Sequence, residues 1–289
     1  MKVALLGTGL LGAAMVKRFH VQNVDITAWN RSQDKLKPLQ EAGIKTTETA
    51  LEAIEQTNVI ILMLTDMQAI QTVLLESEPV KTALKNKTII QMGTIAPQQS
   101  RELAQALAQL DTDYLEAPVL GSIPNVNAGK LVSIVGSSEA QYEQFKPLLS
   151  ELGSQVHYVG EVGSAATVKL AFNHFIASLA TTFGLSLAMV KANGLDVEQF
   201  MGILRDSALY APTYDKKLNN MLERQFDNPN FPTSHMLKDI NLFLDETQKL
   251  ALNGAATEGV RDILQQAVEM GFGEHDYSAL FQAISPEKS

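Results

Sequence analysis

The chain has 289 residues, of which 45% are hydrophobic and 19% charged, a composition typical of a folded globular protein with room for about two domains. Its formal net charge is -9, and Lys and Arg do not cluster, which argues against a nucleic acid partner. The absence of cysteine excludes disulfides and thiolate chemistry. The five histidines are scattered, so we expect no metal site.

The sequence favours a cytoplasmic protein that does not enter membranes. The chain begins directly with a strand-like apolar run and carries no signal-peptide pattern there. The longest uncharged apolar stretch, 175–190, is shorter than the roughly 20 residues that a spanning helix needs. We therefore expect it to form a buried helix of a soluble protein.

Short apolar runs alternate with amphipathic segments in the first half of the chain. This alternation predicts an α/β Rossmann domain, in which helices cover both faces of a doubly wound, mostly parallel sheet. The expected strands are Val3–Leu6, Val24–Ala28, Val59–Met63, Thr88–Met92, Tyr114–Leu115, Leu131–Val135 and Gln155–Val159, with a helix over Glu139–Leu152.

Strand patterns end at Gly163, and helical spacing follows almost to the C-terminus. We therefore expect a nucleotide-binding domain over residues 1–163 and an all-helical domain for substrate binding and dimerisation over 164–289, entered through a long interdomain helix. Expected helix breaks are Gly194, Asp227–Pro232, Asn253–Gly254 and Gly271–Gly273, and residues 285–289 have the composition of a frayed polar tail.

A G-x-G-x-x-G motif follows the first expected strand and precedes a helix. In this context the glycines allow a tight turn, a close approach of a pyrophosphate and close packing of the helix on the strand. An ordinary glycine-rich turn is the less favoured reading. We expect the backbone of this segment to bind a dinucleotide: Gly7, Gly9, Leu10, Leu11 and Gly12.

The end of the second expected strand indicates which dinucleotide is bound. An acidic residue at this place would bind the ribose hydroxyl of NAD, but the chain has Asn30, Arg31 and Ser32. Asn30 is uncharged, and Arg31 offers a bidentate fork for a 2′-phosphate. These residues predict NADP(H) in preference to NAD(H), unless Arg31 is merely a solvated surface residue.

Lys169 and Asn173 are four residues apart in an otherwise apolar helical run, so they project from the same face. Taken alone, the pair would be structural. However, the run begins where the nucleotide domain ends, where we expect a cleft beside the nicotinamide. There an ammonium group protonates a carbonyl oxygen as hydride arrives and accepts the proton in reverse. Asn173 then either orients Lys169 or holds the substrate oxygen.

The segment Gly160-Glu161-Val162-Gly163 followed by Lys169 and Asn173 matches G-x-G-x-x-x-x-x-K-x-x-x-N. With this segment the whole chain resembles the β-hydroxyacid dehydrogenase family, which includes 3-hydroxyisobutyrate dehydrogenases and glyoxylate/succinic semialdehyde reductases. The resemblance implies a Rossmann domain followed by a helical domain, and it makes Lys169 the general acid or base.

Further site residues follow from this resemblance. Met63, Leu64 and Thr65 match the loop on the adenosine side of the cofactor, with Thr65 where proline is frequent. Thr94 matches a loop that reaches both nicotinamide and substrate, and it follows Gly93, where serine is more usual. Lys238 matches a lysine that approaches the cofactor; its neighbour Asp239 matches a substrate residue.

The expected substrate loop departs from the family pattern. Glu116-Ala117-Pro118-Val119-Leu120-Gly121-Ser122 stands where Asp-Ala-Pro-Val-Ser-Gly-Gly is common, so Leu120 replaces the serine that holds a carboxylate. Gly121 and the loop amides still form an anion-binding nest, and Ser122 is either a substrate ligand or a turn residue. Phe231 resembles an aromatic of the semialdehyde reductases, although the usual place of Phe is in the core. Tyr210 and Tyr214 are weaker candidates.

The leading hypothesis is an NADP-dependent oxidoreductase. It transfers hydride between NADPH and a small aldehyde or keto acid of the glyoxylate or succinic semialdehyde type, or acts on the matching hydroxy acid. The alternatives are an imine reductase on the same fold and a non-catalytic NADP-binding scaffold. The long apolar helix from Ser164 to about Lys191 also predicts a homodimer or higher homo-oligomer.

Overall fold

A computed structural model describes residues 1–286, and they form two compact units, Met1–Lys169 and a second that begins at Leu170. The expected domain boundary at 163/164 coincides with the start of helix α9, Ser164–Ala192, which runs across the division between the units. Of the expected polar tail, residues 287–289 lie outside the described part.

The first unit contains a nine-stranded sheet. Its strands are β1 (Lys2–Leu6), β2 (Asp25–Trp29), β3 (Lys45–Thr46), β4 (Val59–Leu62), β5 (Thr88–Gln91), β6 (Asp113–Glu116), β7 (Val119–Leu120), β8 (Val132–Gly136) and β9 (Gln155–Gly160). The order is β3-β2-β1-β4-β5-β6-β8-β7, with β9 paired to β8. Strands β1 to β6 are parallel, whereas β8 is antiparallel to β6 and β7.

The order β3-β2-β1-β4-β5-β6 is that of a dinucleotide-binding Rossmann sheet, confirming the expected fold class. The order in which the chain adds strands changes direction between β1 and β4, because β2 and β3 lie on one side of β1 and β4 to β6 lie on the other. Ligands of such sheets bind outside the carboxyl ends of the strands at this point. The ends lie level, because Leu6 pairs with Leu62, Leu62 with Gln91, and Gln91 with Glu116. The loops after β1, β4, β5 and β6 thus share one edge of the sheet.

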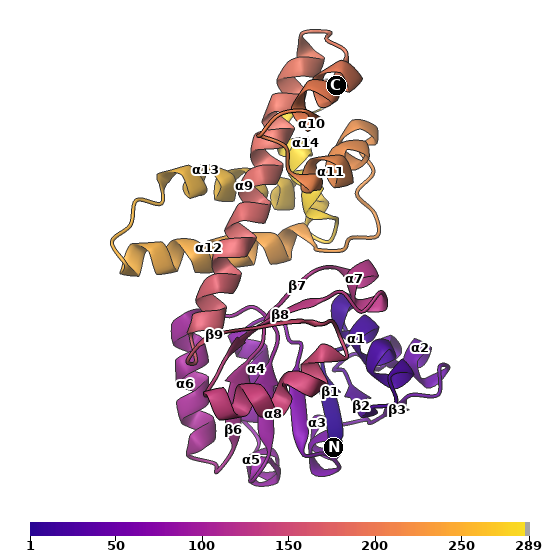
Figure 1. Ribbon diagram of the computed structural model, residues 1–289, viewed down its shortest axis with the longest axis vertical. Coiled ribbons are helices and arrows are strands. Elements are labelled where there is room, and N and C mark those ends of the chain that lie inside the picture. Colours follow the sequence, from indigo (N-terminus) through magenta and orange to yellow (C-terminus); the bar gives the residue numbers. More distant parts are fainter. Residues whose placement is uncertain (287–289) are drawn as a thin grey trace. The chain divides into compact units, whose positions relative to one another are not determined.

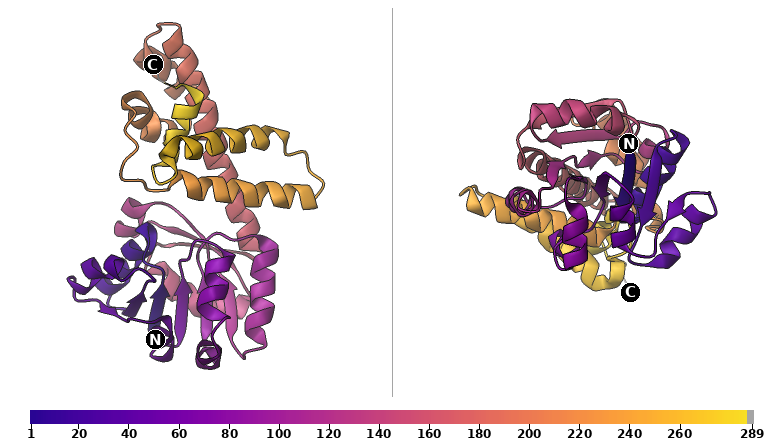
Figure 2. Two further views of the ribbon diagram at one scale, coloured as in Figure 1. Left: turned by 180° about the vertical axis from the view of Figure 1, so that it is seen from behind. Right: turned by 90° about the horizontal axis from the view of Figure 1, so that it is seen from below.

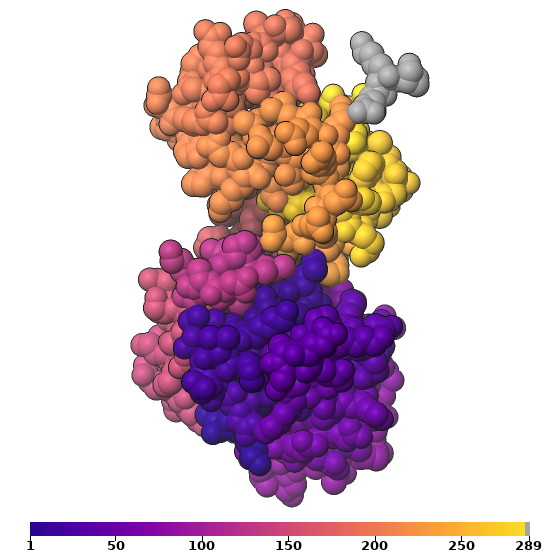
Figure 3. Space-filling view, turned by 90° about the vertical axis from the view of Figure 1, so that its right-hand side faces the viewer, coloured from indigo at the N-terminus to yellow at the C-terminus, as the bar shows by residue number. Residues whose placement is uncertain are grey.

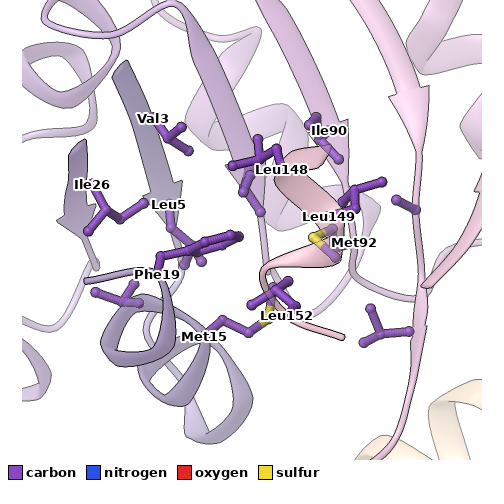
Figure 4. Packing of buried hydrophobic residues seen from close by; sticks show 14 of the residues in the cluster. Val3, Leu5, Met15, Phe19, Ile26, Ile90, Met92, Leu148, Leu149 and Leu152 are labelled. Carbon is purple, nitrogen blue, oxygen red and sulfur yellow. The ribbon is translucent and has the colours of Figure 1, made fainter. Parts of the chain in front are cut away.

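Helices cover both faces of this sheet (Figure 1). They are α1 (Leu10–Val21), η1 (Gln33–Leu36), α2 (Lys37–Gln40), α3 (Ala50–Glu55), α4 (Met67–Leu74), α5 (Glu78–Leu84), α6 (Pro97–Ala108), α7 (Ile123–Asn127) and α8 (Glu139–Ser150). On one face, Met15 and Phe19 of α1 and Leu149 of α8 pack on Leu5 and Ile90 of the sheet (Figure 4). A second apolar cluster, which includes Ile60, Ile89 and Leu103, covers the other face.

The second unit is helical. After α9 it contains α10 (Val197–Arg205), α11 (Pro212–Glu223), α12 (Thr233–Lys249), α13 (Ala255–Ala267), η2 (Val268–Phe272), η3 (Tyr277–Ala279) and α14 (Leu280–Ile284). Helices α12 and α13 lie side by side, joined by the loop 250–254 (Figure 2). Orange and yellow segments of this unit pack together although they are distant in sequence (Figure 3), as α11 does on η3. Its core includes Phe183, Met201 and Phe281.

Three features differ from the sequence predictions. Strands β3 and β7 contain two residues each, too few to show a hydrophobic period, and β7 places Leu120 in a strand where a loop is expected. The break between α10 and α11 falls at 206–211, a segment without glycine. The apolar stretch 175–190 lies within α9, whose 29 residues correspond to the expected long helix from Ser164 to about Lys191. By length and composition α9 could cross a membrane, and only 39% of its most apolar window is buried, so it is less buried than expected.

Candidate active site

The glycine-rich loop connects β1 to α1. Gly7 has a φ of +105°, a conformation that side chains disfavour, and a Cβ there would lie 2.4 Å from the carbonyl oxygen of Met63. A Cβ at Gly12 would lie 2.0 Å from the carbonyl oxygen of Gly7, so α1 packs directly on the turn. Two of the three glycines are therefore required by the fold itself.

Gly9 differs from the other two glycines. It precedes the first residue of α1, and a Cβ placed on it would meet nothing within 4 Å. The missing side chain thus leaves open space beside the first-turn amides of Leu10 and Leu11, where a pyrophosphate would lie. Thr8 Oγ1 is buried with no hydrogen-bond partner among the described residues. Both observations fit a dinucleotide held at this turn.

Asn30 ties the end of β2 to the glycine-rich loop. Its Oδ1 accepts a hydrogen bond from the Thr8 amide at 3.0 Å, and its Nδ2 donates to the Ser32 carbonyl oxygen at 3.0 Å. Arg31 and Ser32 are exposed. Asn30 therefore shapes the loop, and the guanidinium of Arg31 is left at the surface beside it.

The loops after β4 and β5 hold the next group of expected site residues. Met63, Leu64 and Thr94 are half-buried at the carboxyl edge of the sheet, and Thr65 is exposed. Between them, a Cβ at Gly93 would lie 2.5 Å from the carbonyl oxygen of Leu64. The close packing of these two loops explains why a serine is absent at position 93 and leaves Thr94 as the hydroxyl in this segment.

Gly121 and Ser122 connect β7 to α7. Gly121 has a φ of +130°. Both the backbone amide and the Oγ of Ser122 donate to Oδ1 of Asn125, at 3.0 and 2.9 Å. These hydrogen bonds tie Ser122 to Asn125 of α7, as expected of a turn residue, and a role for Ser122 in substrate binding stays a prediction.

Lys169 and Asn173 lie one turn apart on α9, Lys169 half-buried and Asn173 with 1% of its surface exposed. Asn173 Nδ2 donates to Oδ2 of Asp239 on α12 at 2.5 Å. Asp239 is 2% exposed, and its Oδ1 lies 2.8 Å from Lys238 Nζ. The structure thus brings together three expected site residues of the second unit: Asn173, Lys238 and Asp239.

The aromatic candidates belong largely to the packing of the second unit. Phe231 is half-buried against the core, with its ring edge-on to Tyr277. Tyr214 is buried and stacks on Phe183, and the Tyr210 hydroxyl donates to Asp215 at 2.6 Å. Within residues 1–286, no group of three or more His, Asp or Glu side chains is arranged to hold a metal ion.

Glu116, the last residue of β6, is a candidate site residue that the sequence analysis did not single out. It is 1% exposed, and its Oε1 accepts hydrogen bonds from the amides of Gly163, Ala165 and Ala166 at the start of α9. Burial raises the pKa of this carboxyl above its ordinary value of 4.5. The only sequence signal was a carboxylate directly after a buried strand.

Comparison with known proteins identifies the family. Residues 2–160 match the model of the NAD binding domain of 6-phosphogluconate dehydrogenase. Residues 163–284 match that of the NAD-binding domain of NADP-dependent 3-hydroxyisobutyrate dehydrogenase. The chain belongs to the β-hydroxyacid dehydrogenase family. Members of this family are NAD(P)-dependent enzymes that act on CH-OH groups, and this confirms the expected enzyme class and nicotinamide cofactor.

Three relatives match over nearly their whole length. The chain is 31% identical to the uncharacterized oxidoreductase YfjR of Bacillus subtilis, covering 98% of this chain and all of that protein. It is 30% identical to 2-hydroxy-3-oxopropionate reductase of Escherichia coli, covering 98% and 97%. It is 28% identical to glyoxylate/succinic semialdehyde reductase 1 of Arabidopsis thaliana, covering 98% of each chain.

Solved structures share the fold. A 3-hydroxyisobutyrate dehydrogenase from Salmonella typhimurium superimposes with a TM-score of 0.88 at 18% identity, over 98% of this chain and 99% of the other. An imine reductase from Myxococcus stipitatus, crystallised with NADP⁺, gives a TM-score of 0.67 at 20% identity over 99% and 100%. The family fold is therefore present from the first strand to the last helix described.

Proposed function

We propose that the protein is an NADPH-dependent reductase of small aldehydes or keto acids of the glyoxylate or succinic semialdehyde type, with Lys169 as the general acid. The same site catalyses the reverse oxidation of the matching hydroxy acid. NADPH supplies the hydride, and the residues of the chain bind the cofactor, orient the substrate and protonate its carbonyl oxygen.

One observation carries this proposal. Glu116 at the carboxyl end of β6 holds the first turn of α9, so the helix that bears Lys169 begins at the same sheet edge as the glycine-rich loop after β1. Strands β1 and β6 are separated by β4 and β5, which at 4.7–4.9 Å per strand is about 14 Å. A dinucleotide that runs along this edge from the glycine-rich loop would bring its far end towards Lys169.

Lys169 is the proposed proton donor because its ammonium group can pass a proton to a carbonyl oxygen as negative charge develops there. The Lys169 side chain is half-buried. As hydride reaches the carbonyl carbon, the oxygen gains negative charge and takes the proton from Nζ. Asn173 Oδ1 is buried with no hydrogen-bond partner among the described residues, so it is the atom available to accept from Lys169 or from a substrate hydroxyl.

The proposed preference for NADP(H) depends on the end of β2. Asn30 is neutral and already hydrogen-bonded on both sides of its amide, so no carboxylate repels a 2′-phosphate. Arg31 is exposed next to it and supplies a positive charge.

The proposed assembly is a homodimer or higher homo-oligomer through α9. Phe175, Leu185 and Met189 are 59%, 60% and 64% exposed. At about 100° per residue, these side chains fall within one side of the helix. A second copy of the chain is the proposed cover, since a closed symmetric contact buries the same apolar side twice.

The function is tested by following NADPH absorbance with glyoxylate, succinic semialdehyde and a cyclic imine. The proposal expects oxidation of NADPH with one or both aldehydes and little with the imine. Turnover restricted to the imine would favour an imine reductase. Tight NADPH binding with no oxidation by any of the three would favour a scaffold.

A further inference from the structure

Helix α9 begins on a buried carboxylate. The first residues of any helix have amide groups without partners inside the helix, and these carry partial positive charge. In this chain Glu116 Oε1 accepts from three of them, the amides of Gly163, Ala165 and Ala166, at 2.8, 2.7 and 3.1 Å. Glu116 comes from a strand 47 residues earlier than Gly163, so the sheet holds the helix start directly.

The carboxylate is itself fixed in place. Its Oε2 accepts from the Ser100 hydroxyl of α6, and Ser100 Oγ lies 2.7 Å from the Tyr114 hydroxyl. Gly136 of β8 leaves room for it, because a Cβ there would lie 2.4 Å from Glu116 Oε1. Glu116 therefore has a defined position between β6, β8 and α6, and it does not swing as an exposed helix cap would.

The turn of α9 that Glu116 holds is the one that precedes Lys169. Ala165 precedes Lys169 by four residues, so the two lie one above the other on the same side of α9. A residue of a helix turns by about 100° relative to the one before it. Fixing the amides of residues 163, 165 and 166 therefore fixes the rotation of the helix about its axis, and with it the direction in which Lys169 leaves the helix.

We propose that Glu116 is a positioning residue for the proton donor: by holding the first turn of α9 against the carboxyl edge of the sheet, it sets the direction of the Lys169 side chain. This inference rests on the proposed function of Lys169. Glu116 acts through the helix backbone and needs no contact with the substrate.

Three substitutions at position 116 separate position from charge. Glu116→Gln keeps an oxygen for the three amides, and its amide group donates to Ser100 Oγ, so the anchor remains. Glu116→Ala removes the anchor. Glu116→Asp keeps the charge but withdraws the oxygens by about 1.5 Å, the length of one carbon–carbon bond. A displacement of about 1 Å at a catalytic group costs on the order of 10²-fold in rate.

The matched control is Asp196→Ala. Asp196 is an exposed carboxylate that also caps a helix, accepting from the amides of Glu198 and Gln199 at the start of α10. This variant loses a carboxylate cap of the same kind at a helix that carries none of the proposed site residues. It measures what cap loss alone does to the melting temperature and to kcat.

The experiment measures kcat, KM and the dissociation constant of NADPH well below each melting temperature, with Lys169→Ala as the inactive reference. We expect Glu116→Ala and Glu116→Asp to lose roughly 10- to 100-fold in kcat with NADPH affinity nearly unchanged. Glu116→Gln should stay within a few-fold of the wild type, and Asp196→Ala should lose stability only. If Glu116→Ala does not fold, Glu116→Asp carries the test.

Wild-type kcat in both Glu116→Ala and Glu116→Asp would overturn the inference, and so would a loss in Glu116→Gln as large as in Glu116→Asp. Either result leaves the proposed function intact as long as Lys169→Ala is inactive. A wild-type enzyme without turnover on any carbonyl substrate, or a fully active Lys169→Ala, would instead overturn the proposed function.

Discussion

Asn173 donates a hydrogen bond from Nδ2 to Oδ2 of Asp239, joining α9 to α12 across 66 residues of sequence. Both side chains are buried, and the second oxygen of Asp239 pairs with Lys238 at 2.8 Å. This hydrogen bond fixes the orientation of the Asn173 amide, because its nitrogen donates to Asp239. The amide oxygen Oδ1 is therefore the atom left to accept a hydrogen bond. Asp239 accordingly orients Asn173 from within the helical unit.

Replacing Asp239 by Ala should lower both stability and activity. Asn173 Nδ2 would be left buried without an acceptor, which costs about 1–3 kcal/mol in the free energy of unfolding. The Asn173 amide would then be free to turn over, and kcat should fall. Urea unfolding and steady-state kinetics measure the two effects. Asp239→Asn keeps an acceptor for Asn173, so its stability and kcat should lie between those of the wild type and Asp239→Ala. An unchanged kcat in Asp239→Ala would contradict the orienting role.

Arg31→Ala should reduce the preference for NADPH over NADH. A guanidinium paired with a 2′-phosphate at an exposed site contributes about 1 kcal/mol or somewhat more, so the ratio of the two kcat/KM values should fall by about tenfold. Lys35→Ala, which removes an exposed charge from η1, is the control and should leave the ratio unchanged. An enzyme that prefers NADH before any substitution would refute the assignment.

An acidic substitution on the exposed apolar side of α9 should dissociate the oligomer. Phe175→Glu combined with Met189→Glu places two charges in the proposed interface, whereas Val21→Glu makes the same kind of change at an exposed site on α1. Light scattering after size exclusion should show a smaller species for the double variant only. A monomeric wild-type protein would rule out the proposed interface.

Stability should fall on acidification below the ordinary histidine pKa because of His174. Its ring stacks on Phe243 at 4.3 Å between centroids, its Nε2 lies 3.1 Å from Thr257 Oγ1, and burial lowers its pKa below 6.5. The unfolded chain therefore takes up a proton first, so stability present above pH 6.5 is lost as the pH falls towards the lower folded pKa.

The measurement is urea unfolding between about pH 5 and about pH 8 for the wild type and His174→Gln. The wild type should lose stability relative to the variant as the pH falls, while the exposed His157→Gln should follow the wild type. A difference between wild type and His174→Gln that does not change with pH would show that His174 does not carry this effect.

The sheet and the glycine-rich loop could be predicted from sequence because their signals are local. Val59–Leu62 is a continuous apolar run of a buried strand, Thr88–Gln91 has two isoleucines at its centre, and Gly7 and Gly12 occupy positions where a Cβ would collide with backbone. The alternation of strands and helices along the chain then leaves few possible topologies for the sheet. Strands β3 and β7 were missed because two residues carry no period.

The contacts that shape the site could not be predicted, since they join distant residues. Nothing near Glu116 in the sequence indicates that its carboxylate accepts from amides 47 to 50 residues later. Likewise, the sequence leaves Ser122 equally a turn residue or a ligand, and it does not show that the hydroxyl donates to Asn125. Patterns identify residue types suited to chemistry, whereas the tertiary fold decides which hydrogen bonds they make.

The most direct test is single-turnover hydride transfer from bound NADPH in Lys169→Ala, compared with Lys191→Ala, which removes an exposed lysine from the end of the same helix. Loss of the proton donor should slow the wild-type rate by roughly 10²–10⁴-fold and leave the dissociation constant of NADPH within a few-fold, with Lys191→Ala like the wild type. Hydride transfer at the wild-type rate in Lys169→Ala would contradict the account.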